Sequence, residues 1–161
     1  HLQNVDNLEL IFLKALLHLE DFLPSLYLLP YTLQCSEPFT TLQKLAGYLD
    51  TAKFGEFWEL ASSSGLAQKV PGFDDAAREQ IGSFLALAYQ VVPVKVAKTA
   101  LRFDGDEPGF STFLKKHDWA LDDFEMVNVP LNGENKPRAK KFEENIELSQ
   151  VAPLLTVLGK A

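Results

Sequence analysis

The residues that could do chemistry in this 161-residue chain are a single cysteine, Cys35, and three histidines. A cysteine nucleophile needs a positioned histidine beside it. His1 is terminal, His18 lies in an apolar segment and His117 stands among lysines, and none of them has the spacing of a catalytic motif. We therefore expect a structural or surface role for Cys35 and for each histidine.

Carboxylates gather at two places, and both patterns favour a structural role. Asp104 to Gly109 matches the start of a calcium-binding loop, but the twelfth position is Lys115 instead of the bidentate glutamate that calcium requires. An interhelical loop is expected there. Asp74 and Asp75 are explained as a helix cap and a favourable acid in the first helical turn. With no Gly-rich phosphate loop and no Cys/His metal spacing, the sequence predicts no enzyme, no cofactor and no small-molecule substrate.

The charge of the chain bears on its partners. The formal net charge is −7, with the excess of acid before Pro93 and a near balance of acidic and basic residues after it. An acidic chain repels nucleic acid at long range. The composition therefore favours a protein as the partner.

Composition also predicts where the chain resides. One cysteine excludes an internal disulfide and fits a reducing compartment. Glu20, Asp21 and Pro24 interrupt the most apolar stretch, Leu8 to Leu29, so no apolar run reaches the about 20 residues of a membrane span. The stretch also lacks the basic start and the cleavage site of a secretory signal. We expect a cytoplasmic protein without a membrane segment.

Helical patterns dominate the first half of the chain. Leu8 to Leu19 is apolar nearly all round, which predicts a buried helix. Asp21 is expected to cap a short second helix that Pro30 stops. A third helix is expected from Glu37-Pro38, with apolar residues at helical spacing, and a fourth over Lys53 to Ala61. Antiparallel helices of this length are typical of helical-repeat scaffolds.

Three further helices and a hairpin are expected after Pro71-Gly72. The first is a long helix capped by Asp74, and the second covers Val94 to Leu101 with Val96, Ala97, Ala100 and Leu101 inward. The third carries Phe110, Phe113 and Leu114. A half-buried strand over Phe124 to Leu131, the Asn132-Gly133 turn, a return strand over Asn145 to Leu148 and a closing segment over Val151 to Leu158 complete a winged-helix pattern.

An ordered series of short segments extends over roughly Leu10 to Leu158. In chain order the segments are Leu13-Lys14-Ala15-Leu16, Asp21-Phe22, Tyr48-Leu49-Asp50-Thr51, Phe54, Phe57-Trp58, Pro71-Gly72-Phe73, Ala88-Tyr89-Gln90, Trp119, Lys136-Pro137 and Asn145-Ile146-Glu147-Leu148. The series resembles the subunit k family of eukaryotic translation initiation factor 3, among the small PCI-type subunits. The related PCI subunits of the proteasome lid and of the cullin-deneddylating signalosome match less well.

The resemblance implies a fold and a function. It implies helical-repeat-like (HEAT/TPR-like) helices over residues 1–73, with helices expected upstream of His1, and a winged-helix (PCI-type) domain over residues 74–161. It implies a non-catalytic scaffold subunit of initiation factor 3 that contacts other subunits, subunit l foremost, and reaches the small ribosomal subunit through the complex. The alternatives are a subunit of the proteasome lid or signalosome and, from another class, a nucleic-acid-binding winged helix.

Two sets of side chains are candidates for partner contacts. The aromatic residues Phe54, Phe57 and Trp58 are of the kind that dominates interface hot spots, although we favour packing of the helical hairpin against Leu45 and Leu49. The other set is a positive cluster in the expected wing, which could contact ribosomal RNA or an acidic partner or remain a solvated surface. Its members are Lys136, Arg138, Lys140 and Lys141.

Overall fold

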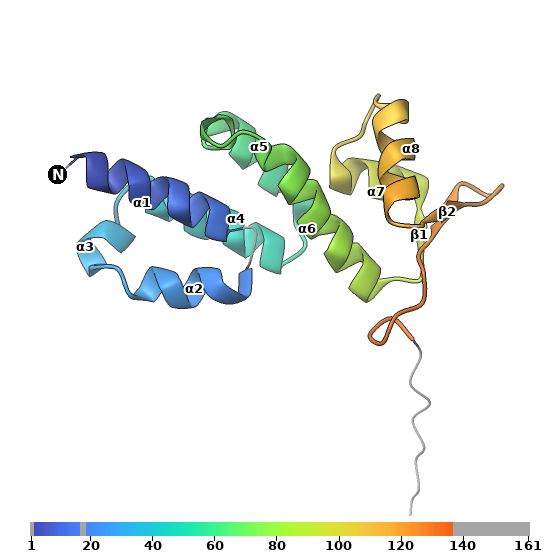
Figure 1. The fold of residues 1–161 in the computed structure, drawn as a ribbon, viewed down its shortest axis with the longest axis horizontal. Helices are drawn as coiled ribbons and strands as arrows, with labels where there is room; N and C mark the ends of the chain where they lie inside the picture. Colours follow the sequence, from blue (N-terminus) through green and yellow to red (C-terminus); the bar gives the residue numbers. More distant parts are fainter. Residues whose placement is uncertain (1, 17–18, 137–161) are drawn as a thin grey trace, which may run out of the picture.

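The computed structural model describes residues 2–16 and 19–136, which run from a set of helices to a small sheet (Figure 1). The helices are α1 (Leu2–Ala15), α2 (Leu19–Tyr27), α3 (Tyr31–Gln34), α4 (Phe39–Asp50), α5 (Phe54–Ser63), the 3-10 helix η1 (Ala67–Lys69), α6 (Phe73–Ala88), α7 (Val94–Leu101) and α8 (Glu107–Lys116). The strands are β1 (Val91–Pro93), β2 (Ala120–Leu121) and β3 (Met126–Asn128). The predicted fold class, mainly helical with a small antiparallel sheet, is confirmed.

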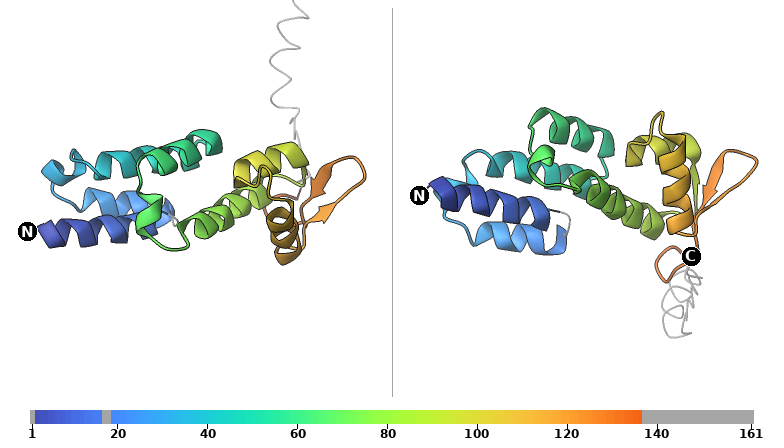
Figure 2. Two further views of the ribbon diagram at one scale, coloured as in Figure 1. Left: turned by 90° about the horizontal axis from the view of Figure 1, so that it is seen from above. Right: turned by 45° about the horizontal axis from the view of Figure 1, so that its top comes forward.

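The N-terminal helices and the sheet lie at opposite ends of the molecule. Helices α1, α2 and α4 pack on one another, and α5 packs on α4 and also contacts α7. Helix α6 extends from the middle of the molecule toward α7 and the sheet (Figures 1 and 2). One cluster of buried apolar side chains includes members from α1 through β3. The two ends therefore share a core.

Among the side chains of α1 that the structure describes, from Asn7 onward, one side is buried and the other is exposed. Phe12, Leu13 and Leu16 are buried, and the Phe12 ring lies edge-on to the rings of Phe22 and Phe39 at 6.0 and 5.6 Å. Ile11, however, is 60% exposed. The expectation of a helix buried all round is wrong, because α2 and α4 cover one face of α1 and leave the face of Ile11 open.

Two predicted helix caps are not formed. Helix α2 begins at Leu19, so Asp21 lies inside it, and Asp74 lies in the first turn of α6, which begins at Phe73. The residue before α6 is Gly72 with φ of 78°, a left-handed conformation that glycine adopts without steric cost. Asp74 and Asp75 still lie where the helix dipole favours acids.

The helices after α6 agree well with the sequence pattern. Helix α7 has the predicted bounds, and its Ala97, Ala100 and Leu101 are buried. Val96 was expected to point inward but is 53% exposed, because it borders a groove that no described segment fills. In α8 the residues predicted for its inner face are buried, namely Phe110, Phe113 and Leu114.

The sheet has the order β1–β3–β2, and both pairings are antiparallel. Val127 in the middle strand is opposite Val92 of β1 and Leu121 of β2. Val127 and Val92 are buried, whereas Leu121 is exposed. The segment Val91–Pro93, for which the sequence predicted no strand, thus forms an edge strand.

Only the first strand and the turn of the predicted Asn132-Gly133 hairpin fall within the described residues. Strand β3 is shorter than the predicted 124–131, and its two sides pair with β1 and β2. Asn132 and Asn135 each donate from Nδ2 to the carbonyl oxygen of Ala86, at 2.8 and 3.0 Å, so this segment turns against the end of α6 instead. The observed hairpin joins β2 to β3. The predicted strand at 145–148 and segment at 151–158 lie outside the described residues.

Candidate interaction surface

The residues singled out for chemistry are far apart. Cys35 is exposed at the end of α3, where its hydrogen bond to Tyr31 raises the pKa of the Tyr31 phenol. His117 follows α8, and helices α3 and α8 lie toward opposite ends of the molecule (Figure 1). Its ring packs on Phe113 at 4.4 Å, and its Nε2 lies 3.0 Å from Glu79 Oε2, an ion-pair distance without hydrogen-bond geometry. These contacts do not form a catalytic pair; His1 and His18 lie outside the described residues.

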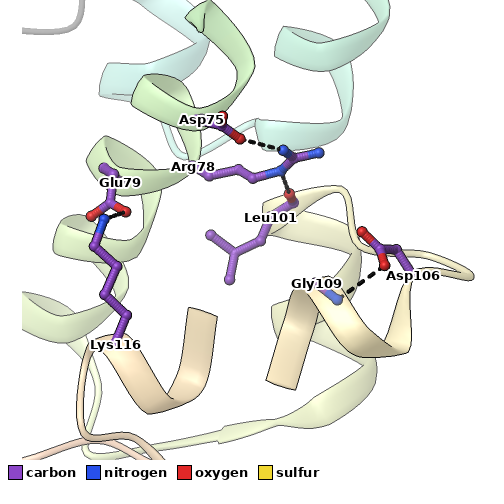
Figure 3. Close-up of polar contacts among 7 residues, drawn as sticks. All are labelled: Asp75, Arg78, Glu79, Leu101, Asp106, Gly109 and Lys116. Atoms are coloured by element: carbon purple, nitrogen blue, oxygen red, sulfur yellow. Dashed lines mark hydrogen bonds and ion pairs between the residues drawn. The ribbon is translucent and has the colours of Figure 1, made fainter. Parts of the chain in front are cut away.

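The loop before α8 has a structural role. Asp106 is the N-cap of α8, and its Oδ1 accepts a hydrogen bond from the backbone N–H of Gly109 at 3.0 Å (Figure 3). Asp104 Oδ1 lies 3.4 Å from the Thr99 hydroxyl at the end of α7. These acids therefore order the interhelical loop predicted at 104–109. Over residues 2–16 and 19–136 no group of three or more His, Cys, Asp or Glu side chains could hold a metal ion.

Helix α6 is joined to α7 and α8 by charged side chains (Figure 3). Arg78 donates from Nε to the carbonyl oxygen of Leu101 at 3.1 Å and from Nη1 to Asp75 at 2.9 Å. Glu79 pairs with Lys116 of α8. Asp75 is thus held in an ion pair within its own helix, which explains this acid as a structural group.

None of the described helices is long and apolar enough to cross a bilayer.

The aromatic set Phe54, Phe57 and Trp58 divides between core and surface. Phe57 and Trp58 are buried, with ring centroids 5.2 Å apart. The indole N–H of Trp58 donates to the carbonyl oxygen of Ala100 at 2.8 Å, so Trp58 connects α5 to the C-terminal turn of α7. Phe54 is half-buried and lines a surface groove.

That groove lies where the end of α4, the start of α5, the end of α6, β1 and α7 meet. Its volume is about 480 Å³, and its walls are mostly apolar. The residues that border it and are exposed include Tyr89, Val91 and Val96. Apolar concave surfaces of this size accept large side chains of a ligand or partner. Sequence patterns did not predict the groove, because its residues come from five separate elements.

The β2–β3 hairpin is the second exposed apolar feature. Phe124 is 84% exposed and Leu121 is 58% exposed, although Phe124 was predicted to lie in a half-buried strand. The hairpin extends away from the helices in Figures 1 and 2. A local feature of the sequence could have predicted this exposure. Phe124 has Asp122, Asp123 and Glu125 as close neighbours, and a segment with so many acidic residues is unsuited to a buried strand.

Of the positive cluster in the expected wing, only the first residue can be placed. Lys136 is exposed after the turn that Asn132 and Asn135 hold against α6. Its three companions, Arg138, Lys140 and Lys141, lie outside the described residues. The hairpin that does extend from the sheet is acidic, so it lacks the positive charge that a nucleic-acid-binding wing carries.

The fold and its surfaces define a class: a small, mainly helical protein with a three-stranded sheet, which exposes apolar side chains at a groove and at a hairpin. The chain belongs to the CSN8/PSMD8/EIF3K family, whose family model matches residues 3–141. This finding confirms the resemblance drawn from the ordered series of short segments.

Two relatives carry the same name, eukaryotic translation initiation factor 3 subunit K. The protein from Dictyostelium discoideum is 27% identical over 154 residues, which cover 93% of this chain and 61% of the relative. The protein from Botryotinia fuckeliana (strain B05.10) is 26% identical over 125 residues, which cover 74% of this chain and 50% of the relative. The chain thus spans about half to three fifths of the length of these relatives.

Proposed function

We propose that the protein is a non-catalytic scaffold subunit of eukaryotic translation initiation factor 3. The observation that carries this proposal is the similarity to two proteins named subunit K, which in the Dictyostelium discoideum protein extends over 93% of this chain. The family description also names CSN8 and PSMD8, so the family alone does not choose among complexes. The two named relatives favour initiation factor 3 over the proteasome lid and the signalosome.

The proposed mechanism is docking without bond chemistry. In the described part of the chain β1 and β2 each have one side unpaired, so each offers backbone N–H and C=O groups to a neighbouring strand. The apolar groove at α4–α7 adds a place for large side chains. Burial of about 1,600 Å² at about 25 cal/mol per Å² gives roughly 40 kcal/mol of gross stabilisation. Most of it is offset by the translational, rotational and side-chain entropy lost on association.

The partners in this proposal are other subunits of the factor, subunit l foremost. Contact with the small ribosomal subunit is made through the complex, and the location is the cytoplasm. The half-buried Phe54, the groove and the edge strand β1 lie close to the junction of α5, α6 and α7, so one partner surface can cover several of them. Phe57 and Trp58 serve in the core beneath that junction.

Charge argues against the nucleic-acid-binding alternative. On α8, which corresponds to the third helix of the winged pattern, Lys116 is paired with Glu79. The β2–β3 hairpin carries three acidic residues within four positions, Asp122, Asp123 and Glu125. Winged helices that grip DNA or RNA place cations at these two elements. A protein surface is therefore the better partner.

An affinity purification from cells tests the proposal. The natural protein is tagged at its own locus, and co-purifying proteins are quantified by mass spectrometry against a strain that expresses the tag alone. Subunits of initiation factor 3 are expected at near-stoichiometric yield. Recovery of proteasome-lid or signalosome subunits in their place would assign the chain to those complexes, and recovery of no defined complex would refute a scaffold role.

A further inference from the structure

The tip of the β2–β3 hairpin exposes a large aromatic side chain that the fold does not use. Phe124 is 84% exposed, and its neighbour Leu121 on the same hairpin is 58% exposed. No aromatic contact within the described residues involves Phe124. An exposed Phe gains nothing for folding, whereas aromatic side chains are enriched among the residues that dominate protein interfaces.

Hydrogen bonds hold the backbone that carries Phe124. Asp122 Oδ1 accepts hydrogen bonds from the N–H groups of Phe124 and Met126, each at 2.9 Å, and the Asp122 N–H donates to the Met126 carbonyl at 2.9 Å. The Glu125 carbonyl accepts from the N–H of Val94 at the start of α7, also at 2.9 Å. The hairpin therefore presents Phe124 from a fixed position relative to α7, which reduces the entropy lost on docking.

The charge around Phe124 restricts what can receive it. Asp122, Asp123 and Glu125 lie within two positions of it, and none of these carboxylates forms an ion pair with the described residues. Docking against an acidic or wholly apolar surface would place these charges beside like charges or strip them of water. A pocket bordered by Lys and Arg compensates them, and a nucleic acid backbone repels them.

We propose that the hairpin tip, Leu121–Glu125, inserts the Phe124 ring into an apolar pocket bordered by Lys and Arg on another protein subunit. The inference rests on the proposed function, because it takes the receiving protein to be a subunit of the same complex. It concerns the side chains of the tip and is separate from backbone pairing along the sheet edges.

A competition experiment measures the contribution of Phe124. The full chain carrying Phe124→Ala is co-expressed with the wild-type chain under a different tag, and the ratio of the two is measured in the purified complex. A loss of incorporation of about tenfold or more is expected, as for a central aromatic contact. Phe124→Leu keeps an apolar side chain and is expected to recover most of the incorporation.

The matched control is Tyr27→Ala, which removes an aromatic side chain that is 71% exposed at the end of α2, far from the hairpin. It should compete as the wild-type chain does. Thermal unfolding of all variants should match the wild type, since the altered side chains are exposed. A second pair of substitutions, Asp123→Asn with Glu125→Gln, should weaken incorporation at low salt and flatten its salt dependence.

Equal incorporation of the Phe124→Ala and wild-type chains would overturn the inference. So would a concentration-dependent homodimer that the Phe124→Ala variant loses in sedimentation, because the receptor would then be a second copy of this chain. Binding of an RNA duplex that depends on Phe124 would overturn it as well. If the wild-type chain enters the proteasome lid or the signalosome, the proposed function fails. The ratio of the Phe124→Ala chain to the wild-type chain is then measured in that complex, so the role of Phe124 is tested separately.

Discussion

Trp58 stabilises the molecule through its area and through one hydrogen bond. The last carbonyl groups of a helix lack partners within the helix. In α7 two of these groups accept from side chains of other helices, the Ala100 oxygen from Trp58 and the Leu101 oxygen from Arg78. Two side chains from α5 and α6 therefore cap the end of α7 and hold the three helices together.

The substitution Trp58→Ala should lower the free energy of unfolding by about 3–5 kcal/mol, since it removes a buried large aromatic side chain. Trp58→Phe keeps most of the apolar area but leaves the Ala100 oxygen without its donor, so a loss of about 1–3 kcal/mol is expected. Urea denaturation of both variants measures these values. A variant with unchanged stability that no longer joins its complex would show that Trp58 is a partner contact instead.

Glu37 offers a test of hydrogen bonding before α4. Its carboxylate accepts hydrogen bonds from the hydroxyls of Thr40 and Thr41, which lower its pKa. A carboxyl whose pKa is lower in the folded state contributes stability above its unfolded pKa and loses it as pH falls through the folded pKa. Because Glu37 is exposed, solvent screens this contribution and the effect on stability should be small.

An NMR titration of the Glu37 carboxyl carbon should therefore give a midpoint below that of an ordinary glutamate. In the double variant Thr40→Val, Thr41→Val the midpoint should rise toward the ordinary value, because the donors are gone. Identical titration curves for the two proteins would show that the hydroxyls do not stabilise the carboxylate.

Helix packing places different demands on two glycines. Gly82 in α6 lies under α8, and a Cβ atom added there would be 2.7 Å from Cζ of the buried Phe113 ring. Gly47 in α4 is exposed, and a Cβ atom there would meet nothing within 4 Å. The same substitution should therefore have opposite effects in the two helices.

We expect Gly82→Ala to destabilise the protein by about 1–3 kcal/mol through overpacking against Phe113. The higher helix propensity of alanine offsets a part of this loss. Gly47→Ala should stabilise it by about 0.5–1 kcal/mol, because alanine loses less conformational freedom in a helix. Thermal or urea unfolding of the two variants measures both. Stabilisation by Gly82→Ala would mean that Phe113 moves freely and that α6 and α8 are loosely packed.

The elements that sequence patterns located best are those whose ends are set locally. Helix α7 has its predicted bounds because Pro93 precedes it and its alanines recur at helical spacing. The β2–β3 hairpin was missed because its turn depends on the Asp122 carboxylate and not on an Asn-Gly pair. The segment with the Asn132-Gly133 pair turns against the end of α6, because the Ala86 carbonyl accepts hydrogen bonds from the side-chain amides of Asn132 and Asn135.

At the scale of the whole molecule, charge predicts weak binding to nucleic acid. The net charge is −7, and the hairpin that extends from the sheet is acidic. Fluorescence anisotropy with a generic duplex at physiological salt should give a dissociation constant weaker than the roughly 10⁻⁴–10⁻⁶ M of non-specific DNA-binding proteins. Sub-micromolar binding that falls steeply with salt would contradict this and revive the nucleic-acid alternative.

The positive cluster after the sheet should matter little for assembly. Exposed ion pairs are worth about 0–1 kcal/mol each and are screened by salt. The combined substitutions Lys136→Gln, Arg138→Gln, Lys140→Gln and Lys141→Gln should leave incorporation into the complex intact at moderate salt, as measured by co-purification. A folded variant that drops out would make this cluster an electrostatic contact, with an acidic partner surface or ribosomal RNA as its target.

The sequence by itself determined the helical character of the chain, its acidic charge and its family. Helical spacing, composition and an ordered series of short segments depend only on the order of residues along the chain. It could not determine which apolar side chains remain exposed. Phe12 and Phe124 are the same residue type, yet one is buried and the other is 84% exposed. That difference depends on which elements pack across from each residue, and only the tertiary structure decides it, because burial is a property of surfaces brought together from distant parts of the chain.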